Sequence, residues 1–150
     1  MIGVFRTADK EKNMANWKMF LIVLAAFLVL DFVWLGLLMK NFYNAELGEL
    51  ARRQGNALAP RWGAAALVYV LIPAGVVLFV RPLLGDQTTY AQAFGWGALF
   101  GVVVYGVYDL TNLAVLEKWT VRMTMIDIVW GGVLCGTMAT LMRVVDRLTK

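Results

Sequence analysis

Four long apolar segments, separated by short polar ones, dominate the pattern along the chain. They cover residues 17–39, 62–80, 91–115 and 121–142. Each approaches the roughly 20 residues that an α-helix needs to cross the hydrocarbon core of a bilayer. None alternates polar and apolar residues in the short runs that are typical of membrane barrel strands. The pattern therefore predicts an all-α fold, an integral membrane bundle of four transmembrane helices.

The polar segments set the expected domain limits. Residues 1–16 predict a polar, disordered tail, residues 17–142 a single transmembrane domain, and residues 143–150 a basic C-terminal tail. The first apolar segment lacks a small-residue cleavage site, so we expect a retained span rather than a signal peptide. In the longest connection, residues 42–53 favour a short amphipathic helix, either on the membrane surface or solvated without a partner.

Composition supports a membrane location. Of the 150 residues, 61% are hydrophobic and 16% are charged, whereas soluble domains carry about 25% charged residues. The net charge is +4, but the basic residues lie in loops and tails, where we expect them to meet membrane lipids rather than nucleic acid. The sequence has no histidine, which excludes His-ligated haem, histidine zinc ligands and a histidine relay. We predict no cofactor and no metal site, and the single Cys135 excludes an internal disulfide.

Three aspartates, Asp31, Asp109 and Asp127, lie inside the apolar segments. A charged side chain at membrane depth costs about 2.5–3.5 kcal/mol on insertion scales, so each is a candidate functional residue. Asp109 precedes the turn between the third and fourth segments by nearly as many residues as Asp127 follows it. Asp31 lies nine residues before Lys40, where the first segment ends on the same side. At equal rise per residue, the three carboxyl groups are expected to share one layer of the bundle.

Other polar and aromatic side chains fall at helical spacing from these aspartates. On the third segment a tyrosine precedes the aspartate by four residues and an asparagine follows it by three, so all three share one helical face. A tryptophan follows each of the other two aspartates by three residues. The candidate ligand or proton site therefore comprises Asp31, Trp34, Tyr105, Asp109, Asn112, Asp127 and Trp130.

Several roles are open for this layer. Carboxyl, amide, phenol and indole groups can satisfy one another's hydrogen bonds, so the layer can act as a polar clamp that holds the helices in register. It can also hold a ligand, an ion or a proton, and direct catalysis is a further interpretation. The glycine pairs Gly97 with Gly101 and Gly132 with Gly136 have GxxxG spacing, which permits close helix approach. Packing within the chain is the simpler use of these pairs, while a homo-oligomer or a membrane partner on the same faces stays open.

Orientation follows from the basic residues. With four spans, both termini lie on one side, which carries eight of the lysines and arginines against six on the other. Because cytoplasmic loops are richer in these residues, the count predicts termini in the cytoplasm.

Four motifs carry a resemblance to a known family. They are Asp31 with Trp34, PRWGAAALVY at residues 60–69, YDLTNLA at residues 108–114 and DIVWG at residues 127–131. Over residues 20–141 the chain resembles an uncharacterised family of small bacterial membrane proteins with four predicted spans, a domain of unknown function. The resemblance implies a multi-pass protein of the bacterial inner membrane, and it implies no activity.

Three classes of function follow from these features. The first is a binding or partner protein whose aspartate layer holds an amphiphilic small molecule or stabilises an assembly. The second is a small proton-coupled transporter that uses one of the three aspartates. It is similar in outline to the small multidrug-resistance proteins, which also have four spans and a membrane-embedded carboxylate. The third is a subunit of a lipid-modifying enzyme, although no nucleophile–base pair or cofactor loop in the sequence supports it, and no catalytic residue is predicted.

Overall fold

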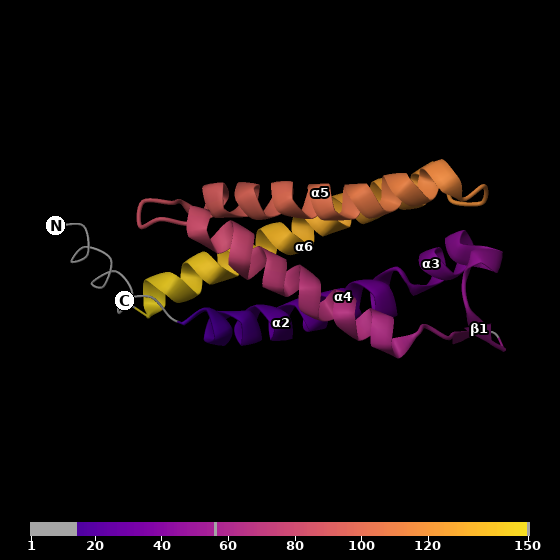
Figure 1. Ribbon diagram of the computed structural model, residues 1–150, viewed down its shortest axis with the longest axis horizontal. Coiled ribbons are helices and arrows are strands. Elements are labelled where there is room, and N and C mark those ends of the chain that lie inside the picture. The colour runs from indigo at the N-terminus through magenta and orange to yellow at the C-terminus, as the bar shows by residue number, and fades with distance from the viewer. Residues whose placement is uncertain (1–14, 56, 150) are drawn as a thin grey trace.

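Long helices make up most of the computed structural model, which describes residues 15–55 and 57–149 (Figure 1). Within this part of the chain, four helices are long and apolar enough to cross a membrane. They are α2 (Asn16–Phe32) with its π-helical continuation η1 (Val33–Leu38), α4 (Trp62–Gly75) with η3 (Val76–Val80) and η4 (Arg81–Leu83), α5 (Tyr90–Val115), and α6 (Val121–Leu148). The predicted all-α bundle of four membrane-spanning helices is confirmed. The tail predicted for residues 1–16 lies, except for its last two residues, outside the described residues.

The third and fourth spans form the most extensive helix contact of the bundle. A Cβ atom on Gly97 of α5 would lie 2.3 Å from the carbonyl oxygen of Cys135 on α6. One on Gly101 would lie 2.0 Å from the carbonyl oxygen of Gly131. Only residues without a side chain allow two helix backbones to approach this closely. The first GxxxG pair is therefore used for packing within the chain.

The first and second spans cover one side of the α5–α6 pair. α2 contacts both α4 and α6, and α4 crosses the bundle obliquely (Figure 1). Pro73 lies inside α4 and is followed by the π-helical η3, as expected where proline removes a backbone hydrogen bond. The apolar core that joins these spans is built from side chains of α2, η3 and α6, namely Met19, Val23, Phe27, Val76, Val77, Val80, Leu134, Met138 and Met142.

A buried ion pair fixes the end of the bundle where α2 begins and α6 ends. Arg81 of η4 donates from Nη2 and Nε to the carboxylate of Asp146 on α6, at 2.6 Å and 3.2 Å. Its Nη1 donates to the side chain of Asn16 at 2.7 Å. One guanidinium group therefore joins the first, second and fourth spans, and its charge is matched by a carboxylate.

The end of α6 differs from the sequence-based expectation. The helix continues to Leu148, so most of the tail predicted for residues 143–150 is its last turns. Arg143 is buried, and its Nε donates to the backbone oxygen of Thr88, in the α4–α5 connection, at 2.8 Å. Two basic residues of this predicted tail, Arg143 and Arg147, bind the α4–α5 connection.

The longest connection lies at the other end of the bundle (Figure 1). It contains α3 (Lys40–Leu47), η2 (Gly48–Leu50) and a short hairpin of β1 (Arg53–Gln54) and β2 (Ala57–Leu58). The helix predicted over residues 42–53 is thus shorter than expected. It ends because Gly48 adopts a positive φ of 43°, which favours glycine.

One face of α3 packs on its own chain. Tyr43 is buried and belongs to a small apolar cluster with Trp119 and Met123. Glu46 accepts a hydrogen bond from the Thr120 hydroxyl at 2.5 Å and lies 3.6 Å from Arg122. These contacts hold α3 over the α5–α6 turn and point Tyr43 into the bundle.

Candidate functional site

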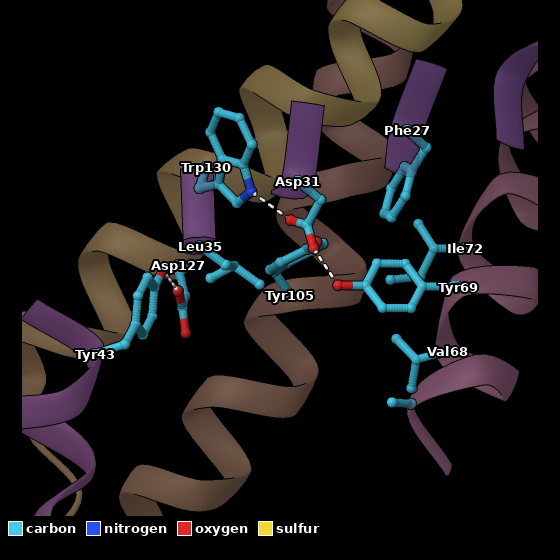
Figure 2. A pocket seen from close by; sticks show the side chains of 11 residues that line it. Phe27, Asp31, Leu35, Tyr43, Val68, Tyr69, Ile72, Tyr105, Asp127 and Trp130 are labelled. Carbon is cyan, nitrogen blue, oxygen red and sulfur yellow. Dashed lines mark hydrogen bonds between the residues drawn. The ribbon is translucent and has the colours of Figure 1, made fainter. Parts of the chain in front are cut away.

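Asp31 joins three spans at membrane depth. Its Oδ2 accepts a hydrogen bond from the phenol of Tyr69 on α4 at 2.8 Å (Figure 2). Its Oδ1 accepts one from the indole Nε1 of Trp130 on α6 at 3.0 Å. The Asp31 side chain is buried. Both donors are neutral groups, so these bonds satisfy the carboxyl oxygens without matching a negative charge.

Asp127 on α6 receives its hydrogen bond from α3, in the connection between the first and second spans, rather than from another span. The phenol of Tyr43 donates to Asp127 Oδ1, and Trp34 Nε1 donates to the Tyr43 oxygen at 3.2 Å. Burial raises the pKa of Tyr43 above its ordinary value, and the hydrogen bond to Asp127 raises this pKa further. The Tyr43 phenol therefore remains a proton donor toward Asp127 throughout the neutral range.

The two tryptophans of the predicted site stack face to face. The ring centroids of Trp34 and Trp130 are 4.3 Å apart, and their planes differ by 5°. Trp130 donates to Asp31, whereas Trp34 donates to Tyr43, the partner of Asp127. The stacked pair thus connects the surroundings of two aspartates on different helices.

Asp31 and Asp127 face one cavity of about 280 Å³ (Figure 2). Its polar lining consists of Asp31, Tyr43, Tyr69, Tyr105, Asp127 and Trp130, and the rest of its lining is apolar. Among the described residues that line it, two are acidic and none is basic. We call this space the acidic cavity.

The third aspartate lies beside the acidic cavity rather than in its wall. Asp109 on α5 is fully buried, and neither of its carboxyl oxygens has a hydrogen-bond partner among the described residues. Its carboxyl group interacts electrostatically with that of Asp127. The buried amide nitrogen of Asn112 likewise has no hydrogen-bond partner in the described part of the chain.

The seven predicted site residues thus occupy three kinds of position. Four of them line the acidic cavity, namely Asp31, Tyr105, Asp127 and Trp130. Trp34 does not line the cavity but stacks on Trp130, which does. Asp109 and Asn112 do not line it, although Asp109 adjoins Asp127.

Sequence reasoning does not identify two tyrosines of the site. Tyr69 is the only hydroxyl-bearing residue of the apolar segment 62–80, a signal that the sequence does contain. Tyr43 lies outside the apolar segments and reaches Asp127 only because α3 folds back over the bundle. No periodicity in the sequence indicates that contact.

Comparison with known proteins identifies a family. Residues 16–144 match the family described as "Predicted membrane protein (DUF2177)". Because the match covers most of the chain, the protein belongs to this family. No curated protein and no solved structure matches the chain.

Proposed function

We propose that this member of the DUF2177 family binds an amphiphilic small molecule whose polar head occupies the acidic cavity. One observation carries the proposal: Asp31 and Asp127 face the same space, and no described residue of its lining is basic. A buried carboxylate without a counter-charge is costly. A ligand head that donates hydrogen bonds or carries positive charge lowers that cost.

The size and lining of the acidic cavity support a small ligand with one polar end. Its volume of about 280 Å³ is near the lower limit of the roughly 300–1,000 Å³ common for small-molecule sites, which combine apolar walls with a few polar groups. A clamp role for Asp31 is compatible with binding. Its bonds to Tyr69 and Trp130 hold three helices around the cavity and preserve its shape.

Native mass spectrometry of the protein extracted from its membrane tests this proposal. We expect a co-purifying amphiphile on the wild type, lost from Asp31→Asn and Asp127→Asn, which keep the side-chain shape but remove the charge. Glu117→Gln is the matched control, because Glu117 is an exposed carboxylate in the α5–α6 turn. A wild type that is consistently empty, or variants that retain the ligand, would contradict the proposal. Unchanged elution in size-exclusion chromatography shows that a variant is folded.

A proton-coupled transporter is a second candidate, favoured by the buried Asp109. Two neighbouring carboxyl groups, Asp109 and Asp127, disfavour each other's ionised form, so one of them can hold a proton. Binding of a cationic ligand could release that proton. In proteoliposomes, ligand-dependent proton flux that disappears in Asp109→Asn would support transport. Flux that is absent in the wild type, or that survives Asp→Asn replacement at all three positions, would reject it.

We further propose a bacterial inner-membrane location with both termini in the cytoplasm. The excess of eight basic residues over six on the terminal side supports this orientation. Glu117→Cys provides a test, because the native Cys135 is buried. A membrane-impermeant maleimide should label this variant in cells with a permeable outer membrane and an intact inner membrane. Labelling only after lysis would mean that the α5–α6 turn lies in the cytoplasm and that the proposed orientation is wrong.

A further inference from the structure

A second cavity adjoins the acidic cavity at membrane depth. It measures about 460 Å³ and lies between α4 and α5, lined by Val68, Leu71, Ile72, Val104, Tyr105 and Tyr108. Val68, Ile72 and Tyr105 also line the acidic cavity, so the two spaces share walls. We call the second space the lateral cleft.

The lateral cleft exists because α4 and α5 diverge. Phe100 of α5 packs against Gly75 at the end of α4, where an added Cβ atom would lie 2.7 Å from the ring. α5 also contacts η3, which follows Gly75, but the earlier turns of α4 separate from it. Leu71 in these turns has 65% of its surface exposed. Since both walls lie inside membrane spans, the cleft opens toward lipid rather than water.

We infer that the lateral cleft holds the hydrocarbon chain of a single-chain cationic amphiphile, a long-chain primary amine, whose ammonium group reaches Asp31 and Asp127. This inference rests on the proposed function and names the chemical class of its ligand. The molecule reaches the acidic cavity sideways from the bilayer, between α4 and α5. Its chain therefore never leaves an apolar environment.

Two observations select this chemistry. Four of the six residues that line the lateral cleft are aliphatic, and the other two are tyrosines, so its walls match a hydrocarbon chain. The acidic cavity at its inner end presents two carboxyl groups and, within the described lining, no basic side chain. An ammonium group matches that charge, whereas a carboxylate or phosphate head is repelled by it.

Photolabelling of the full-length protein in lipid nanodiscs tests the inference. The probe is dodecylamine with a diazirine on its terminal carbon, and mass spectrometry of peptides locates the label after illumination. We expect label on the cleft residues of α4 and α5, Leu71 and Val104 among them, and competition by unmodified dodecylamine. A probe with the same chain and a carboxylic acid head should label these peptides roughly tenfold less.

Matched variants separate the cleft from general partitioning into lipid. Val104→Trp fills the lateral cleft and should lower labelling of the α4 wall roughly tenfold. Val107→Trp is the control, because Val107 lies on the same helix, is 66% exposed and does not line the cleft. It should leave the labelling unchanged. Asp127→Asn should lower labelling by the amine probe.

The outcomes distinguish this inference from the proposed function. If label spreads evenly over lipid-facing surfaces, the cleft assignment is wrong. If Val104→Trp has no effect while Asp127→Asn still abolishes amine binding, the cleft assignment is also wrong, but the site for the ammonium head stands. If amine and acid probes label equally, the cationic class is wrong. If neither Val104→Trp nor Asp127→Asn changes binding of the amine, both the inference and the proposed function fail.

Discussion

The indole ring of Trp130 stacks on that of Trp34 with 4.3 Å between centroids, while its Nε1 donates to Asp31 at 3.0 Å. One side chain therefore combines a ring contact with a bond to a buried carboxyl group. The bond satisfies one of the two carboxyl oxygens of Asp31, and Tyr69 satisfies the other. Trp130 also fixes one wall of the acidic cavity.

Trp130→Phe should keep ring stacking but remove the donor to Asp31. We expect a loss of about 1–3 kcal/mol in the free energy of unfolding, because a buried acceptor is left unsatisfied. Unfolding in mixed detergent micelles, followed by circular dichroism, measures it. Trp62→Phe is the control, since Trp62 is 77% exposed. Equal stability of the two variants would mean that the bond contributes nothing.

Gly101→Ala should separate α5 from α6. The added Cβ atom would lie 2.0 Å from the carbonyl oxygen of Gly131, and this backbone atom can move only with its helix. We expect destabilisation of about 1–3 kcal/mol or more. Gly95→Ala on the same helix meets nothing within 4 Å and should be neutral or slightly stabilising. The same detergent unfolding assay compares them, and a Gly101→Ala variant as stable as Gly95→Ala would refute the close contact.

Asp146→Asn should weaken the opposite end of the bundle. It removes the carboxylate that accepts two hydrogen bonds from the buried Arg81 guanidinium, and breaking a buried pair on one side costs about 3–5 kcal/mol. Replacing both residues by leucine should recover part of this loss, because both charges of the buried pair are then removed together. Thermal unfolding of the two variants checks the order. A double variant less stable than Asp146→Asn would show that the charges are not what destabilises the single variant.

Tyr43 gives the site a pH dependence at alkaline pH. Its pKa is raised by burial and by the bond to Asp127, whereas in the unfolded chain the phenol ionises near its ordinary pKa of about 10. The stability contributed by protonated Tyr43 is therefore complete below about pH 10 and is lost as pH rises toward the folded-state pKa. Tyrosinate absorbance of wild type and Tyr43→Phe should coincide at about pH 11. A wild-type excess of one tyrosinate at that pH would show an unperturbed phenol.

The sequence could predict the spans and the proximity of two of the aspartates. A segment that crosses a membrane must form all its backbone hydrogen bonds internally, as a helix, and must be apolar over its length. The limits of the spans can therefore be read from hydropathy. Constant rise per residue then relates the heights of Asp109 and Asp127, which the structure brings together. Asp31 lies close to them as well, because Asp31 and Asp127 both line the acidic cavity.

The sequence could not predict which side chains share a wall. Rise per residue gives height but not rotation about the helix axis or the choice of neighbour. Asp109 therefore adjoins Asp127 but does not line the acidic cavity, whereas Tyr69 does. The lateral cleft depends on the divergence of α4 from α5 beyond the Gly75–Phe100 contact, a tertiary feature without a local signal.

A high-resolution crystal structure of the native protein grown in a lipidic mesophase tests the binding of an amphiphile most directly. We predict continuous non-protein density with its head between Asp31 and Asp127 and its tail in the lateral cleft. A well-ordered acidic cavity that contains only water between the two carboxyl groups, with no density in the lateral cleft, would contradict binding and leave the aspartates as a clamp.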